Sequence, residues 1–217
     1  MTRVGLVADT HVGEYLDEIP AAALAALDGC DLILHAGDLS VPGVIETLAT
    51  IAPVVAVRGD HDRLDGLALP EIAVVSVAGR RIAVMHGKRH TAIEWGLVIG
   101  HLAARQRIAW RAGLHRALLA RTGPVDCLVY GHWHEPFIGT VDGTLVVSPG
   151  AVCPWGSLEG GLPPGPRLTG VIDRSVSRFR RQLGLEAMRP RLAILTVSDA
   201  GLDVEFLTLG PPVLPIV

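Results

Sequence analysis

The first sixty residues alternate short apolar runs with Ala/Leu-rich segments, and this alternation restricts the fold more than any other feature of the chain. The apolar runs 4–8, 31–35 and 54–57 indicate β-strands, and the segments 20–27 and 42–52 between them indicate helices. This order predicts a parallel sheet with right-handed crossovers. In such a sheet a ligand site lies beyond the carboxyl ends of the strands.

Acidic residues and histidines follow each of these three runs. They are Asp9 and His11, then Asp38, and then Asp60, His61 and Asp62. Side chains two positions apart in an extended chain point to the same side, so Asp9 and His11 can hold one metal ion. Because parallel strands end at the same edge of a sheet, we expect these residues to gather there.

The pattern changes to hairpins in the later part of the chain. Short apolar runs joined by Gly-containing turns predict three hairpins, which pair 72–77 with 81–85, 137–140 with 144–147, and 192–197 with 202–207. The run ending at residue 85 delivers His86, and a buried strand over 125–130 precedes His132 and His134. Two further strands therefore end in side chains that can bind a metal.

The side chains collected from these strand ends comprise three carboxylates and four imidazoles. They are Asp9, His11, Asp38, Asp60, His86, His132 and His134. Oxygen and nitrogen ligands without thiolate suit Mn, Fe, Zn, Co or Ni, and seven ligands fit two ions with one bridging carboxylate. Two ions roughly 3.5–4 Å apart acidify a bridging water and clamp a phosphoryl group for in-line attack. A single histidine at a strand end is usually structural, but its recurrence at successive strand ends favours metal binding.

Five short motifs occur in one order along the chain. They are Asp9-x-His11, Gly37-Asp38, Gly59-Asp60-His61-Asp62, His86-Gly87 and Gly131-His132-x-His134. Together they resemble the motifs of the calcineurin-like metallophosphoesterase superfamily, and the length and strand order resemble its small bacterial phosphodiesterase branch, which includes the retromer scaffold subunit. The resemblance covers about 2–155 and the final hairpin. It implies an α/β fold with a two-sheet β-sandwich flanked by helices, in four layers α/β/β/α.

The resemblance also implies how the seven ligands divide between two ions. Asp38 would bridge them, one ion would add Asp9, His11 and His134, and the other would add Asp60, His86 and His132. We expect two divalent transition-metal ions, with Mn²⁺ first and Fe, Zn, Co or Ni as alternatives. A metal-bound hydroxide would then attack the phosphorus of a small phosphodiester or phosphomonoester, the phosphodiester being favoured.

Asp60 departs from the family pattern, which normally has Asn at this position. The added negative charge means that two divalent ions, three carboxylates and a bridging hydroxide sum to about neutral. We therefore expect either a weaker attraction for anionic phosphate with lower Lewis acidity, or a more highly charged ion in one site.

His61 stands where many members of the family place a histidine near the substrate. The resemblance implies that His61 donates a hydrogen bond to the phosphoryl oxygens or protonates the leaving oxygen, with Asp62 as the residue that orients it. The alternative is that His61 supports the metal ligands from the outer layer and does not contact the substrate. Trp133 stands at a position where the family more often has a small residue. Its side chain either lines the pocket or packs against neighbouring side chains.

Four histidines lie outside the motifs. We expect His35, inside a strand, to belong to the core, and we expect His101 and His115, in a helical segment, to lie on the surface. His90 follows His86 by four residues and is a candidate for contact with the substrate. The three cysteines are far apart and lack metal-type pairing, so we expect them to be small core residues.

Basic residues gather in two segments outside the family motifs. Of 19 Lys and Arg, seven lie within 88–121 and seven within 167–191. We expect one domain over 1–217, with helical basic insertions at about 88–124 and 156–190. They would form a cap for a polyanionic substrate such as a nucleotide, and the alternatives are a solvated helix face or a contact between copies of the chain.

Net charge and hydropathy exclude several classes of function. A net charge of −3 and a pI near 6.3 argue against a general binder of nucleic acid or anionic membranes, and no apolar run reaches 18 residues. The chain opens without a signal peptide, so we expect a cytoplasmic protein with a small phosphorylated substrate. Two hypotheses remain: a metal-dependent phosphoesterase, and a non-catalytic metal-binding scaffold on the same fold.

Overall fold

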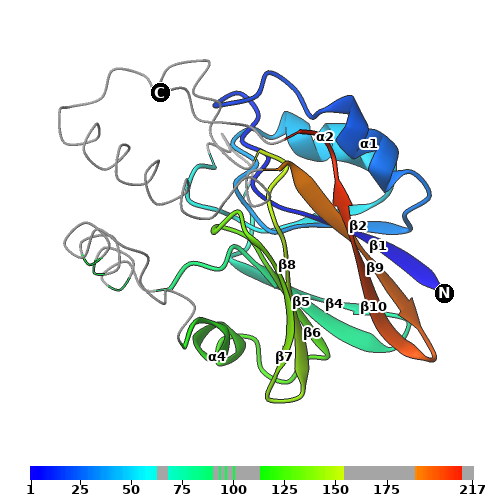
Figure 1. Cartoon of the computed structure of the whole chain (residues 1–217), viewed down its shortest axis with the longest axis vertical. Coiled ribbons are helices and arrows are strands. Elements are labelled where there is room, and N and C mark those ends of the chain that lie inside the picture. The colour runs from blue at the N-terminus through cyan, green and yellow to red at the C-terminus, as the bar shows by residue number, and fades with distance from the viewer. Residues whose placement is uncertain are drawn as a thin grey trace.

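Two mixed five-stranded sheets pack against each other in the computed structural model, which describes residues 1–62, 68–89, 93, 96, 100, 113–153 and 189–211 (Figure 1). The interface between the sheets is a cluster of fully buried aliphatic side chains. Val4 and Leu6 come from the first sheet, and Val84, Val129 and Val147 come from the second. Their burial holds the two sheets together.

The first sheet has the strand order β10-β9-β1-β2-β3. Its parallel part consists of β1 (Thr2–Val7), β2 (Leu32–His35) and β3 (Val54–Ala56), as the alternation of strands and helices predicts. β9 (Arg191–Ser198) pairs antiparallel with β1, and β10 (Gly201–Thr208) completes the sheet. β1 therefore has a partner on both edges.

Two short helices cover the outer face of this sheet. They are α1 (Ala21–Leu27), between β1 and β2, and α2 (Gly43–Ala49), between β2 and β3. Leu27 and Leu48 are fully buried and pack on Ile33 of β2 and Ile194 of β9. The outward side chains of the strands thus meet the apolar faces of the helices.

The second sheet has the order β4-β5-β6-β8-β7. Its elements are β4 (Ile72–Val77), β5 (Arg80–Met85), β6 (Cys127–Tyr130), β7 (Pro136–Val141) and β8 (Thr144–Pro149). β5, β6 and β8 run parallel, whereas β4 and β7 are antiparallel edge strands. α4 (Leu114–Leu119) packs Leu114 and Leu118 on the outer face of this sheet. Helix, sheet, sheet and helix confirm the predicted four-layer fold.

One prediction about the core is wrong. His115 lies on the sheet-facing side of α4 and is buried, although we expected it on the surface. Its Nε2 hydrogen-bonds the Tyr130 hydroxyl at 3.0 Å, and its ring lies 4.3 Å from that of Phe137. The second sheet thus offers the imidazole both an aromatic ring to pack on, that of Phe137, and a hydrogen-bond partner, the Tyr130 hydroxyl. His35 and the three cysteines are buried, as predicted.

Several predictions fall on residues outside the described ranges. They concern His90, His101, most of the helical segment over 91–121, the loop over 156–166 and the basic helix over 169–188. Among the described helices, none has the length and apolar character needed to cross a membrane.

Candidate metal centre

Side chains from the ends of five strands converge at one edge of the sandwich. Asp9, His11 and His134 form the first group, in which the ligand atoms lie within 4.8 Å of one another. His134 Nε2 is 3.4 Å from His11 Nε2 and 3.5 Å from Asp9 Oδ1. The loop after β6 thus adds an imidazole to the pair that follows β1.

Asp60, His86 and His132 form a second group with the same spacing of ligand atoms. His132 Nδ1 is 3.2 Å from His86 Nε2 and 3.5 Å from Asp60 Oδ2. His86 Nε2 and Asp60 Oδ2 are 4.0 Å apart. The loops after β3, β5 and β6 therefore supply one ligand each.

Asp38, which follows β2, lies between the two groups. Its Oδ2 atom is 3.7 Å from His11 Nε2 and 3.3 Å from His86 Nε2. The Asp38 side chain is almost completely buried, so its carboxylate has little contact with solvent. A single carboxylate oxygen that faces one nitrogen from each group has the placement that a bridging ligand requires.

The backbone at the strand ends adopts a conformation that non-glycine residues seldom take. The φ angle is 52° at Asp9, 48° at His11, 58° at Asp38, 74° at His132 and 55° at His134. Each such residue costs of order 1–3 kcal/mol unless its surroundings hold it in place, and such residues cluster at functional sites. The chain turns left-handed directly after β1, β2 and β6, which directs the polar side chains towards a common centre.

Two glycines leave room beside these ligands. A Cβ atom at Gly59 would clash with the Asp38 backbone nitrogen and Oδ1, and one at Gly131 would lie 2.9 Å from Ala36 O and 3.0 Å from Asp9 Oδ2. Any larger residue would displace the carboxylates. The glycines of two motifs are therefore required by close packing around the centre.

The outer hydrogen bonds of the histidines fit metal binding. His86 Nδ1 donates to Ala36 O at 3.0 Å, which leaves Nε2 directed at Asp38 and the second group. His11 Nδ1 lies 3.3 Å from Glu14 Oε2, so its Nε2 is free in the same way to face the first group. Histidines that bind metals typically use their second nitrogen for such a contact. Three carboxylates and four imidazoles without thiolate suit divalent transition-metal ions.

Glu14 is a site residue that the sequence reasoning missed. Its carboxylate contacts His11, accepts a hydrogen bond from Ser40 Oγ at 3.2 Å, and lies 3.0 Å from His61 Nδ1. Burial acts to raise the pKa of Glu14, but the hydrogen bonds from His11 and His61 lower it to about 2. The carboxylate therefore stays ionised and holds both rings. Its position three residues after His11 is the one signal that the sequence offers.

His61 and Asp62 lie beside the centre and have different partners. The His61 side chain is 44% exposed, its ring lies 5.0 Å from that of His11, and its backbone N–H donates to Asp38 Oδ1. Asp62 instead accepts backbone hydrogen bonds from Ser40 at 2.8 Å and Gly59 at 2.6 Å. Asp62 thus joins the loops after β2 and β3, while Glu14 is the carboxylate that faces the His61 ring.

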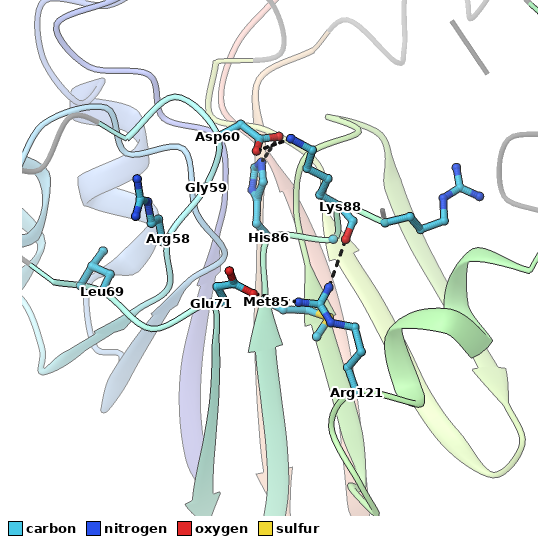
Figure 2. Close-up of a pocket in the computed structure, with 11 residues that line it drawn as sticks. Arg58, Gly59, Asp60, Leu69, Glu71, Met85, His86, Lys88 and Arg121 are labelled. Atoms are coloured by element: carbon cyan, nitrogen blue, oxygen red, sulfur yellow. Dashed lines mark hydrogen bonds and ion pairs between the residues drawn. The ribbon is translucent and has the colours of Figure 1, made fainter. Parts of the chain in front are cut away.

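Asp60 has a cationic partner on the side that faces away from the histidines. Lys88 Nζ lies 2.7 Å from Asp60 Oδ1, and Oδ2 faces His86 (Figure 2). Oδ2 also lies 3.5 Å from His132 Nδ1. The lysine offsets the negative charge that Asp60 adds where the family normally has Asn. The Lys88–Asp60 pair therefore has a net charge near zero, as a neutral Asn ligand at this position would have.

Two imidazoles of the second group have opposite pKa shifts. Burial acts to lower the pKa of His86, but the hydrogen bond and charge of Asp38 raise it to about 9, and the charge of Asp9 acts in the same direction. Burial and the neighbouring His86 lower the pKa of His132 to about 3. Without an ion, the cluster therefore keeps a proton on His86 and a neutral ring at His132.

The His86 proton makes the stability of the metal-free protein depend on pH. A pKa raised from 6.5 to about 9 stabilises the folded state below pH 6.5, and this stabilisation is lost as the pH rises through 9. We expect the metal-free protein to lose about 1–3 kcal/mol of folding free energy over this window. Denaturant titration of chelator-treated protein at both ends of the window measures the loss.

Added Mn²⁺ gives the internal control for this pH dependence. An ion needs the neutral imidazole, so its binding releases the proton and stabilises the fold more strongly at high pH. The metal-loaded protein should therefore show a flat or rising stability over the same window. A metal-free protein that is equally stable at both pH values would contradict the assignment of this proton to His86.

The comparisons with known proteins agree with this geometry. A family model described as calcineurin-like phosphoesterase superfamily domain matches residues 2–161. A probable metallophosphoesterase of Methanothermobacter thermautotrophicus is 27% identical over 210 residues, which cover 97% of this chain and 94% of the relative. A phosphodiesterase of Methanocaldococcus jannaschii is 22% identical over 192 residues, which cover 82% of this chain and 96% of the relative.

A solved structure extends the likeness to the whole fold. Wild-type Vps29 of Entamoeba histolytica, in complex with zinc, superposes with a TM-score of 0.56 at 21% identity, covering 96% of this chain and 100% of that chain. The family model spans well over half of the chain, and the strand-end side chains lie where metal ions could bind them. The chain belongs to the calcineurin-like phosphoesterase superfamily.

Proposed function

We propose that this protein is a dinuclear metal-dependent phosphoesterase that hydrolyses a small phosphorylated substrate, a phosphodiester ahead of a phosphomonoester. The observation that carries the proposal is the position of Asp38, whose Oδ2 faces His11 on one side and His86 on the other. Family membership supports the reaction class, and the similarity to an archaeal phosphodiesterase supports the preference for diesters.

The seven candidate ligands would divide between two ions. Asp9, His11 and His134 would hold one ion, Asp60, His86 and His132 the other, and Asp38 both. Bound divalent ions supply Lewis acidity towards a phosphoryl oxygen and lower the pKa of a coordinated water. Ala36 O and Glu14 keep the coordinating nitrogens of His86 and His11 turned inward. Mn²⁺ is our first choice of ion, ahead of Fe, Zn, Co and Ni.

His61 has the exposure and the partner that a proton donor to the leaving oxygen needs. Its ring is partly open to solvent beside His11, and Glu14 orients it from behind. We expect His61→Ala to lower kcat about 100-fold. Glu14→Gln should lower kcat about tenfold, because the glutamine leaves the Nδ1 atoms of His11 and His61 without an anionic partner.

Measuring kcat, KM and metal content together tests these roles. His61 is not among the seven ligands, so His61→Ala should keep its full metal content. Glu205→Gln, an exposed glutamate on β10, is the matched control for Glu14→Gln and should leave kcat unchanged. Loss of metal in His61→Ala would show that the residue holds an ion rather than acting on the substrate.

We also propose a cytoplasmic protein that binds neither membranes nor nucleic acid, as its charge and hydropathy suggest. The second candidate function is a non-catalytic metal-binding scaffold. The similarity to Vps29 in complex with zinc favours this alternative, because metal binding on this fold is not by itself catalysis. Retention of a coordinating side chain at all seven positions favours the enzyme.

Elemental analysis and phosphate-ester hydrolysis on the same preparation separate the two functions. Wild type and His132→Ala are assayed with bis(p-nitrophenyl) phosphate and p-nitrophenyl phosphate, with and without Mn²⁺. We expect about two metal ions per chain and diester turnover that His132→Ala abolishes. Bound metal without turnover of either ester would favour the scaffold, and absence of both would exclude the enzyme.

A further inference from the structure

A pocket of about 470 Å³ opens beside the second group of metal ligands. Asp60 and His86 belong both to that group and to the lining of the pocket (Figure 2). The volume lies in the range of sites for small organic ligands, roughly 300–1,000 Å³. Given the proposed function, a phosphoryl group held at the metal centre would direct the rest of its molecule into this space.

The charged residues of the pocket are predominantly cationic. The pocket is lined by four cations and two acids, which are Arg58, Lys88, Arg89, Arg121, Asp60 and Glu71. The excess of two positive charges matches a phosphate dianion better than a single carboxylate. Leu69 and Met85 complete the lining with apolar surface for the organic part of a ligand.

Two of the four cations form ion pairs with the two acids. Lys88 Nζ pairs with Asp60 at 2.7 Å, and Arg121 Nη2 pairs with Glu71 at 3.2 Å. Arg121 Nη1 also donates to the carbonyl oxygen of Lys88 at 3.1 Å, which ties the two pairs together along one side of the pocket. These contacts fix that wall and leave its net charge near zero.

Arg58 lies on the opposite side of the pocket, beside Gly59 and Leu69 (Figure 2). The residue is exposed, and within the described part of the chain its guanidinium group makes no hydrogen bond or ion pair. Its backbone N–H is fixed by Pro70 O at 2.9 Å, so the start of the side chain is well positioned. An unpaired guanidinium at a pocket wall is suited to bidentate contact with phosphate oxygens.

We propose that this pocket binds a second phosphate group, carried by the part of the substrate that is not cleaved, and that Arg58 is its main contact. The substrate class is then a small organic molecule with two phosphate groups, such as a nucleoside bisphosphate. The metal centre holds one phosphate and Arg58 the other. Glu71 lowers the affinity for the second phosphate, because it occupies Arg121.

Phosphonates test this inference without depending on turnover, since their P–C bonds are not hydrolysed. Calorimetry on the metal-loaded full chain compares alkane bisphosphonates of increasing chain length with the matching alkyl monophosphonates. At the best chain length the bisphosphonate should bind at least about tenfold more tightly, the value of one hydrogen-bonded charge contact. Arg58→Gln should remove this advantage, and Glu71→Gln should increase it.

Arg80→Gln is the matched control, because the Arg80 side chain is partly exposed but pairs with Asp126 at the start of β5. It should leave the advantage unchanged. Bisphosphonates that bind no better than monophosphonates at any length, or an advantage that survives Arg58→Gln, would overturn the inference. Failure of the proposed function would instead appear as absence of ester hydrolysis while the phosphonate result stands.

Discussion

In the proposed two-ion centre, Asp38→Asn should remove both ions and lower kcat/KM by at least about 100-fold, more than loss of an outer hydrogen-bond partner usually costs. One carboxylate oxygen lies between a nitrogen of each group, at 3.7 Å from His11 Nε2 and 3.3 Å from His86 Nε2. An amide at this position supplies neither the charge nor a second lone-pair donor of equal strength. Metal content by elemental analysis and diester hydrolysis measure the two effects.

The same substitution at Asp142 is the control for Asp38→Asn. Asp142 is an exposed turn residue between β7 and β8 with a φ of 48°, a conformation that Asn tolerates. Asp142→Asn should therefore keep both metal and activity. If Asp38→Asn lost the ion of one group and kept the other at full occupancy, Asp38 would be a ligand of a single site rather than a bridge.

Lys88→Gln should lower kcat/KM about tenfold, and Asp60→Asn should abolish this effect. Lys88 offsets the charge of Asp60 across 2.7 Å, so its loss leaves the second group with an uncompensated carboxylate that repels the anionic substrate. In the Asp60→Asn background there is no such charge, and Lys88→Gln should change kcat/KM by less than about threefold. The coupling energy should be about 0.7–1.4 kcal/mol, within the range for residues in contact.

Four proteins, wild type, the two single variants and the double variant, make this a complete double-mutant cycle. The readouts are kcat/KM for bis(p-nitrophenyl) phosphate and metal content, because a purely structural role of Lys88 would lower both in every background. If Lys88→Gln lowered kcat/KM equally in the wild-type and Asp60→Asn backgrounds while metal content stayed unchanged, the lysine would act on the substrate alone.

The sequence predicts the parallel part of the first sheet and the gathering of the candidate ligands for one reason, whereas the two-sheet sandwich is predicted by the family resemblance. Each candidate ligand stands shortly after an apolar run, and parallel strands carry their ends to one edge whatever their order in the sheet. The order itself is not predictable locally, because β1 pairs with β9 and β6 pairs with β8 across long stretches of chain. Helical periodicity over α4 likewise did not specify that His115 faces the sheet.

The residues that support the ligands are harder to predict than the ligands. Glu14 meets His61 across 47 positions, and Lys88 meets Asp60 across 28 positions. Neither glutamate nor lysine is unusual in a loop, so the residue type alone does not indicate that Glu14 or Lys88 belongs to the site. Only the three-dimensional approach of separate loops reveals that one orients two rings and the other offsets a charge.

The pairing of β1 with β9 also sets an order of events during synthesis. β1 carries Asp9 and His11 at its end, but its second edge is covered only by β9, which begins at Arg191. Contacts between segments so distant in sequence form late and slowly. On the ribosome, β1 therefore emerges before β9, and its second edge stays unpaired until β9 has been translated.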